Sequence, residues 1–481
     1  MENKNIKNKV ISGLFWKLME RGGVQGIQFI VQIVLARVLL PSDYGLISLL
    51  TIFISVSNVF IQTGFGTSLI QKKEIDEVDY SSVFYLNLLA SVVVYIVLFF
   101  AAPYISNFYN EPQLTSVLRV LSIILFFGAI NSVQNAVVSR TMQFKRFFYS
   151  SLGGIIISGI IGIGMAYAGF GVWALVSQQL SNQLIITIIL WFTLKWRPKL
   201  LFSFERVKEL FSFGWKLLCS SLIDTLYNNI YGLIIGKIYT SEILGYYNRA
   251  DQFPQVIISN INGAIQSVML PAMSESQEDR GRVKDMVRRS IVTSSFIIFP
   301  MMIGLAVCAK TLVLVLLTEK WLPCVPFLQI LCLSYSLWPI HTANLQAINA
   351  LGRSDIYLKL EIIKKCVGIV ALSISIPFGI FVMVASKPFL AVISSIINAS
   401  PNKKLLNYSA KEQWKDILPS LSLSIIMAIV IYPISLLPIN TIFKLVLQVL
   451  SGIVIYLGLA YIFKLECFKY ILNTVSELRK R

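Results

Sequence analysis

The stretch Phe15-Trp16-Lys17-Leu18 recurs in altered form as Gly214-Trp215-Lys216-Leu217, and each copy opens a long apolar segment. The likeness continues beyond the phrase, because Ser42-Asp43 corresponds to Ser241-Glu242 and Gly45 corresponds to Gly245 after one inserted residue. Two short sequence matches that occur in the same order in both halves indicate an internal duplication. The sequence therefore predicts a fold that is built from two copies of one unit.

The chain is too apolar to be a soluble domain. Its 481 residues are 56% hydrophobic and 14% charged, with a mean hydropathy of +0.72. Apolar runs of roughly 20 residues, the length that crosses a hydrocarbon core about 30 Å thick, recur along the whole chain. We therefore predict an all-α polytopic membrane protein with about fourteen transmembrane helices. The predicted spans are residues 10–38, 44–68, 82–104, 114–139, 148–168, 172–194, 210–237, 244–272, 290–317, 325–350, 356–377, 380–400, 416–437 and 441–464.

The distribution of basic residues predicts which side of the membrane each loop faces. The net charge is +18. When the loops are assigned to alternating sides, one side holds both termini and nearly all of the loop lysines and arginines, and the other side carries Lys320 alone. Because basic loops remain in the cytoplasm, this asymmetry places both termini there. This asymmetry also explains the net positive charge of the chain, so the charge does not indicate a nucleic-acid partner.

The duplication predicts the organisation of the helices. Spans one to six and seven to twelve are the two copies, and an even number of spans brings both copies into the membrane in the same sense. We therefore expect two six-helix lobes related by a pseudo-twofold axis along the membrane normal, plus two extra C-terminal helices. The expected boundaries are 1–208 for the N-lobe, 209–402 for the C-lobe and 403–481 for the last two helices and a cytoplasmic tail. Residues 283–289 are expected to form a short helix on the membrane surface.

Motifs of enzymes and cofactor sites are not indicated. The segment Gly232-Leu233-Ile234-Ile235-Gly236-Lys237 is one residue too short for a phosphate-binding loop and lies in a hydrophobic span, so its GxxxG spacing is better interpreted as helix packing. The six cysteines form no CxxC pair, and neither a disulfide framework nor a metal site is expected. We predict that the protein is not an enzyme and needs no cofactor.

Charged residues inside the predicted spans are the candidate functional residues. An ionised group in a bilayer is costly, so it faces a wet cavity or a partner. The first span contains Lys17, Glu20 and Arg21 on one helix face, with Arg37 at its outer end. Arg21 is about halfway across the span.

The second copy carries its own intramembrane charges. Lys216 lies near the cytoplasmic end of the seventh span and Asp224 lies near its centre, while Arg249 and Asp251 lie below the outer end of the eighth. Lys216 and Arg249 could instead extend to the interface with their long side chains. His341, the only histidine, is either a hydrogen-bonded core residue or a proton relay. We favour functional roles for Arg21 and Asp224, because both lie deep in their predicted spans, where an ionised group needs a wet cavity or a partner.

Several motifs are spread over most of the chain. They are Leu35-Ala36-Arg37 with Pro41 and Asp43-Tyr44-Gly45, then Gly64-Phe65-Gly66, Leu69-Ile70-Gln71, Gly245-Tyr246-Tyr247-Asn248-Arg249-Ala250, Pro271 and Leu351-Gly352-Arg353-Ser354-Asp355. In this order the motifs resemble the polysaccharide-exporter branch of the multidrug/oligosaccharidyl-lipid/polysaccharide (MOP) flippase superfamily, and within it the Wzx-type colanic-acid and teichuronic-acid exporters.

The resemblance implies a function and a site. It implies an alternating-access flippase in the bacterial cytoplasmic membrane, which carries oligosaccharide repeat units linked to undecaprenyl pyrophosphate from the inner to the outer leaflet. It also implies cationic residues in a central cavity, for which Arg21, Arg37, Arg249 and Lys216 are the candidates, with Asp224 as the candidate for ion coupling. Arginine suits this role, because it binds phosphate through two parallel hydrogen bonds. The partners implied are the lipid-linked oligosaccharide, membrane lipid and a polysaccharide polymerase.

Two alternatives remain at this point. A drug/cation antiporter of the same superfamily would be expected to use intramembrane carboxylates, of which only Asp224 is well placed. A polytopic enzyme such as a polysaccharide polymerase or ligase would be expected to carry a substantial outward loop, whereas the longest predicted outward loop here is 105–113.

Overall fold

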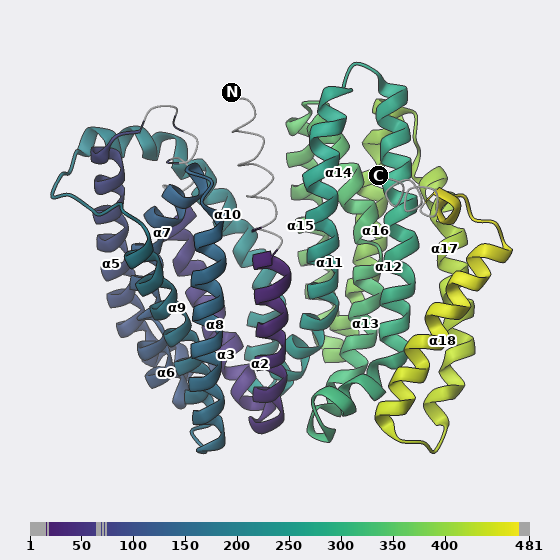
Figure 1. The fold of residues 1–481 in the computed structure, drawn as a ribbon, viewed down its shortest axis with the longest axis horizontal. Helices are drawn as coiled ribbons and strands as arrows, with labels where there is room; N and C mark the ends of the chain where they lie inside the picture. Colours follow the sequence, from purple (N-terminus) through teal and green to yellow (C-terminus); the bar gives the residue numbers. More distant parts are fainter. Residues whose placement is uncertain (1–15, 17–18, 64–68, 70–71, 73–74, 471–481) are drawn as a thin grey trace. The chain divides into compact units, whose positions relative to one another are not determined.

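Helices joined by short connections make up the described part of the chain in this computed structural model (Figure 1). The structure describes residues 16, 19–63, 69, 72 and 75–470, and only the backbone of Arg21, Thr63, Phe213, Ala264 and Val268. Within these ranges no residue lies in a β-strand. Eleven of the described helices are long and apolar enough to cross a membrane. The prediction of an all-α, multi-pass membrane protein is thus confirmed.

The chain divides into two units, Met1–Gly245 and Tyr246–Arg481. The helices of unit 1 are η1 (Glu20–Val24), α2 (Gln25–Val38), α3 (Pro41–Asn58), η2 (Val59–Thr63), α5 (Glu77–Tyr109), α6 (Gln113–Leu121), α7 (Ile124–Arg140), α8 (Phe144–Tyr167), α9 (Val172–Thr193) and α10 (Phe204–Ile238). Both η1 and η2 are single turns of π-helix.

Unit 2 begins within the second turn of α11. Its helices are α11 (Ser241–Glu275), α12 (Arg280–Leu316), η3 (Glu319–Cys324), α13 (Val325–Ser336), α14 (Trp338–Ala350), α15 (Ser354–Ser375), η4 (Ile376–Phe378), α16 (Ile380–Leu406), α17 (Ala410–Ile431), η5 (Tyr432–Leu436) and α18 (Thr441–Ile462). Residues 283–289 belong to the long helix α12. The expected short surface helix is therefore wrong, because the chain continues without a break into the apolar part of α12.

Local sequence signals explain where several helices begin and end. Asp76 caps α5, because its carboxylate accepts a hydrogen bond of 2.9 Å from the backbone N–H of Asp79, and Asp79 accepts one in return from the backbone of Asp76. The helix ends at Asn110, whose φ of 57° lies in the left-handed region. Ser409 and Glu412 form the same reciprocal cap at the start of α17.

Two predicted spans are interrupted near their middle. Span 114–139 is divided into α6 and α7 after Ser122, whose hydroxyl donates 2.7 Å to the backbone oxygen of Leu118. Span 325–350 is divided into α13 and α14 just before Pro339, which lacks a backbone N–H. Serine hydroxyls that bond to the preceding turn bend helices. The two spans are the fourth of each predicted copy.

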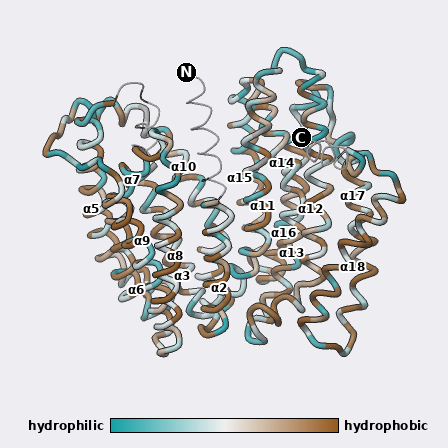
Figure 2. The backbone as a smooth tube through the Cα atoms, in the orientation of Figure 1, coloured by the Kyte–Doolittle hydropathy of each residue, from teal (hydrophilic) through white to brown (hydrophobic). Residues whose placement is uncertain are grey.

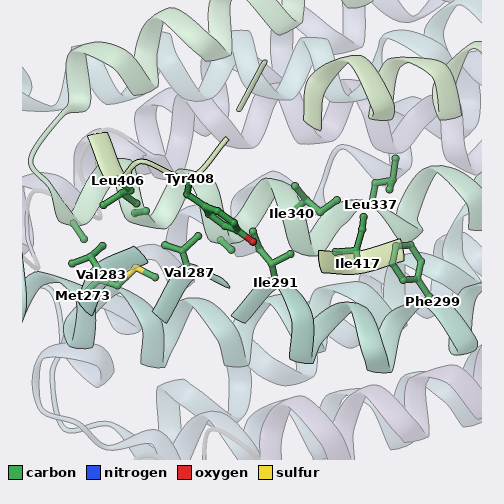
Figure 3. Packing of buried hydrophobic residues seen from close by; sticks show 13 residues of the cluster. Met273, Val283, Val287, Ile291, Phe299, Leu337, Ile340, Leu406, Tyr408 and Ile417 are labelled. Atoms are coloured by element: carbon green, nitrogen blue, oxygen red, sulfur yellow. The ribbon is translucent and has the colours of Figure 1, made fainter. Parts of the chain in front are cut away.

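Residues in the middle of the helices are mostly hydrophobic, and many of the connections are hydrophilic (Figure 2). In unit 2 a cluster of buried residues joins α11, α12, α14 and α17, together with the turn after α16. Figure 3 shows it, with Val287 and Ile291 of α12 close to Tyr408. Tyr408 donates 2.7 Å from its hydroxyl to the carboxylate of Asp416, which satisfies the only polar atom of that side chain.

Gly45 and Gly245, which correspond to each other in the duplicated sequence, lie against one another inside unit 1. A Cβ atom on Gly45 would lie 1.6 Å from the backbone oxygen of Ser241, and one on Gly245 would lie 2.0 Å from the backbone oxygen of Pro41. The first turns of α3 and α11 can approach so closely only because both positions lack a side chain.

Candidate functional site

The first predicted cations lie at the beginning of unit 1. Lys17 is outside the described residues, and so is the side chain of Arg21, whose backbone follows Glu20 in η1. Arg37 lies in the last turn of α2, where its side chain is exposed while the neighbouring Leu35 and Ala36 are buried. Arg37 therefore lies on the side of α2 that faces away from the packing of unit 1.

Two further predicted residues lie on α10, which packs against α3, α5 and η2. The side chains of Lys216 and Asp224 are both exposed in unit 1. Both residues therefore lie at the surface of unit 1. Their roles in substrate binding and ion coupling stay predictions.

Arg249 has a different environment. Its side chain is only 4% exposed, and its guanidinium carbon lies 5.3 Å from the centre of the Trp321 ring. It also donates a hydrogen bond of 2.7 Å to the side-chain oxygen of Gln252. Such cation–π contacts strengthen when they are shielded from water. Contact between Arg249 and a phosphate would require this packing to open.

A polar cavity lies inside unit 1. It has a volume of about 420 Å³, which is within the range of small-molecule sites in proteins. Five carboxamide side chains line it, and they are Asn58, Gln62, Asn131, Asn135 and Gln183. Ser139, Ser150, Ser151 and Glu20 complete its polar lining, and Glu20 is the only ionisable residue among the residues that form its wall. We call this site the amide cavity.

The packing of α7 brings the carboxamides of α3 and η2 to the cavity. A Cβ atom on Gly128 would lie 2.7 Å from Nε2 of Gln62 and 3.1 Å from Oδ1 of Asn58, so a larger residue would displace the ends of these side chains. These two side chains are joined by a hydrogen bond of 3.1 Å from Gln62 to Asn58. One turn further along α7, Asn131 donates 2.9 Å to the hydroxyl of Thr187 in α9.

The amide cavity was not predicted from the sequence, because the candidate residues were selected by their charge. A signal was nevertheless present, since Asn58 and Gln62 are four residues apart, and Asn131, Asn135 and Ser139 follow at the same interval. Residues four apart share one face of a helix. Polar stripes in otherwise apolar helices could have predicted a hydrated face on α3 and on α7.

Unit 2 contains a second group of polar side chains, whose contacts with one another were not predicted from the sequence. Tyr335 donates a hydrogen bond of 3.1 Å to Asp251, and Lys387 donates to the hydroxyl of Tyr247. His341 contacts Asn398 at 3.2 Å through Nδ1. These contacts join α11, α13, α14 and α16, and they are consistent with the hydrogen-bonded core role considered for His341.

The motif at residues 351–355 forms a turn between α14 and α15. Gly352 has a φ of 71°, and Arg353 donates two parallel hydrogen bonds of 2.9 Å to the carboxylate of Asp355. These bonds lower the pKa of Asp355 to about 2. The pair is exposed, and its geometry explains the motif as the start of α15.

Apolar helices in two units, with a polar cavity inside a helix bundle, define a multi-pass membrane protein of the kind that moves solutes. The chain belongs to the family described as polysaccharide biosynthesis protein, whose model matches residues 34–326. The family resemblance inferred from the sequence motifs is confirmed by this match.

Relatives and solved structures agree with this assignment. The teichuronic acid biosynthesis protein TuaB of Bacillus subtilis (strain 168) is 24% identical over 358 residues, which cover 73% of this chain and 73% of TuaB. The lipopolysaccharide biosynthesis protein WzxC of Escherichia coli (strain K12) is 26% identical over 367 residues, or 75% of this chain and 74% of WzxC.

The fold is similar to that of two transporter groups. The lipid II flippase MurJ in an inward closed conformation superposes with a TM-score of 0.75 and 16% identity, covering 94% of this chain and 98% of MurJ. An inward-facing multidrug resistance MATE transporter of the MOP superfamily gives a TM-score of 0.60 and 15% identity over 81% of this chain and 98% of its own. At such identities the likeness establishes the fold alone.

Proposed function

We propose that this protein is a flippase for lipid-linked oligosaccharides in a bacterial cytoplasmic membrane, with both termini in the cytoplasm. Its cargo is a repeat unit on undecaprenyl pyrophosphate, which it turns from the inner to the outer leaflet by alternating access. The observation that carries the proposal is the family match over residues 34–326, which covers most of unit 1 and the first part of unit 2. A polysaccharide polymerase that consumes the flipped unit is the downstream partner, and the protein itself catalyses no covalent step.

The chemistry of the cargo supports this proposal. A pyrophosphate carries charges that hydrocarbon cannot solvate, and arginine or lysine side chains can replace its water shell. Arg37 and Lys216 are exposed in unit 1, and Arg21 lies next to Glu20 of the amide cavity in the chain. We assign these three residues to the pyrophosphate. The predicted role of Arg249 in unit 2 requires its contact with Trp321 to open.

Replacement of Arg21 tests the proposal. We expect Arg21→Ala to leave the amount of protein in the membrane unchanged but to abolish surface polysaccharide, because the pyrophosphate loses a bidentate partner. Lipid-linked repeat units should accumulate on the cytoplasmic leaflet, where a membrane-impermeant glycan label applied to intact cells does not reach them.

A matched arginine provides the control. Arg282 is exposed near the start of α12, and Arg282→Ala should leave surface polysaccharide unchanged. Normal surface polysaccharide in the Arg21→Ala strain would remove Arg21 from the mechanism. A drug antiporter would instead show altered drug efflux with no trapped glycan lipid, which would overturn the proposal itself.

Asp224 is proposed to couple flipping to an ion gradient. Its carboxylate is exposed on α10 near the centre of the predicted span. Asp224→Asn removes the charge and keeps the shape, so flipping should become insensitive to an ionophore that collapses the gradient. The measurement is the rate of glycan appearance at the outer leaflet with and without ionophore. An unchanged sensitivity would exclude Asp224 from coupling.

A further inference from the structure

The lining of the amide cavity matches the chemistry of sugars more closely than that of ions. A carboxamide offers two donors and an acceptor, and a sugar hydroxyl, like a serine hydroxyl, both donates and accepts. The cavity presents five carboxamides and one carboxylate. A hard cation instead selects several converging oxygens at about 2.0–2.6 Å, and carboxamide N–H groups would oppose it. A space of about 420 Å³ is also far larger than a dehydrated ion needs.

One buried acceptor in the cavity wall has no partner. Asn131 is 4% exposed and uses its N–H group for Thr187, whereas its Oδ1 accepts no hydrogen bond from any residue that the structure describes. Buried polar atoms are nearly always paired, and an exception indicates a group that a ligand or water satisfies. Asn131 therefore has an acceptor ready for a donor inside the cavity.

The backbone around the cavity gives a second, independent indication. Glu20 comes from the π-helical turn η1, and Gln62 comes from the π-helical turn η2. Turns of π-helix are rare and occur frequently at functional sites. In the part of the chain that the structure describes, both π-turns of unit 1 thus contribute side chains to the same cavity.

We propose that the amide cavity is a carbohydrate subsite, which takes uncharged sugar residues of the transported lipid. This inference rests on the proposed function, because it assigns the glycan to unit 1 while cations bind the pyrophosphate. The carboxamides of Gln183 and Asn135 donate to and accept from sugar hydroxyls or N-acetyl groups. Neither side chain makes a hydrogen bond to another described residue, so both can be replaced without breaking an internal contact.

Binding to purified protein in lipid nanodiscs tests the proposal. The probes are lipid-linked repeat units, extracted from cells that lack the transporter, and undecaprenyl pyrophosphate without sugar. The unmodified protein should bind the repeat unit at least tenfold more tightly. Gln183→Met and Asn135→Leu should each weaken repeat-unit binding about three- to tenfold, the value of one or two neutral hydrogen bonds, and leave binding of the bare lipid unchanged.

Gln113→Met is the matched control, because Gln113 is exposed on α6 in the same unit and does not line the cavity. It should bind both lipids as the unmodified protein does. Equal affinity of the unmodified protein for the two lipids, or equal weakening of both by Gln183→Met, would overturn the carbohydrate subsite. Loss of a sodium-dependent step in the variants, with glycan affinity retained, would overturn it in favour of an ion site. A protein that binds neither lipid would instead contradict the proposed function.

Discussion

Polar side chains inside the apolar helices differ in whether they have partners. Asn344 is completely buried and exchanges hydrogen bonds of 2.7 and 2.9 Å with Gln413. Gln183 lines the amide cavity and makes no side-chain hydrogen bond to the residues that the structure describes. A satisfied carboxamide stabilises the packing of helices, and an unsatisfied one beside a cavity is available to a ligand.

The first prediction at the scale of single residues concerns Gly45. We expect Gly45→Ala to destabilise the protein by at least about 1–3 kcal/mol, since the added methyl group would overlap the backbone oxygen of Ser241 and a backbone cannot rotate away as a side chain can. The midpoint of thermal unfolding in detergent measures the effect. Gly26→Ala is the control, because a Cβ atom at Gly26 meets nothing within 4 Å. An equal midpoint for both variants would show that α3 and α11 do not approach so closely.

At the scale of elements, hydrogen bonds between carboxamides join helices that are distant in the sequence. Asn344 of α14, Asn402 of α16 and Gln413 of α17 are all completely buried, and Asn402 donates 2.6 Å to the side-chain oxygen of Asn344. Three helices of unit 2 are therefore joined at one point. The cost of burying these groups is offset only while all of them are paired.

This network predicts a non-additive mutational effect. Asn344→Leu should lower the free energy of unfolding by about 1–3 kcal/mol, because it leaves the carboxamide of Gln413 buried without its partner. The double variant Asn344→Leu/Gln413→Leu should cost less than the sum of the two single changes, as denaturant unfolding would show. Gln329→Leu is the control on an exposed side chain of α13. Strictly additive costs would contradict the coupling.

At the scale of the whole molecule, packing divides the chain after Gly245, and the lobe boundaries expected from the duplication stay a prediction. The expected border lies at residue 208, whereas unit 1 extends to Gly245 and includes α10. The reason is packing, since α10 contacts α3, α5 and η2 of unit 1. The pseudo-twofold relation of the lobes stays a prediction.

Cysteine substitutions at two glutamines can report the orientation of the protein in the membrane. Gln113 lies in a predicted outward loop and Gln277 in a predicted cytoplasmic loop, and both are exposed. In a variant without the six native cysteines, a membrane-impermeant maleimide applied to intact cells should label Gln113→Cys and spare Gln277→Cys. Permeabilised cells, in which both should react, provide the control. The opposite pattern would reverse the orientation and place both termini outside.

Much of this architecture could be predicted from the sequence because its signals are local. Runs of apolar residues between residues 82 and 104 or between 441 and 464 identify helices without knowledge of any contact, and each predicted span coincides with one helix or two consecutive helices over the residues that the structure describes. The breaks within spans 114–139 and 325–350 were not predicted, because a turn of one or two residues inside an apolar run hardly changes the hydropathy of that run.

The candidate site was predicted only in part. Charged residues such as Arg37 and Asp224 can be identified from the sequence, because each ionised side chain is costly to place in a membrane by itself. Asn131, Gln183 and Gly128 do not, because each is an ordinary helix residue when considered alone. They become a site only after α7 and α9 pack together around a space.

The sequence by itself determined that this chain crosses a membrane many times, which family it belongs to and which residues carry charge, because hydropathy and motif order are properties of consecutive residues. Only the tertiary structure decided that Arg249 is buried against Trp321 while Arg37 is exposed, and that five carboxamides enclose one cavity. Both properties depend on contacts between helices that are distant in the sequence, and no local sequence pattern specifies those contacts.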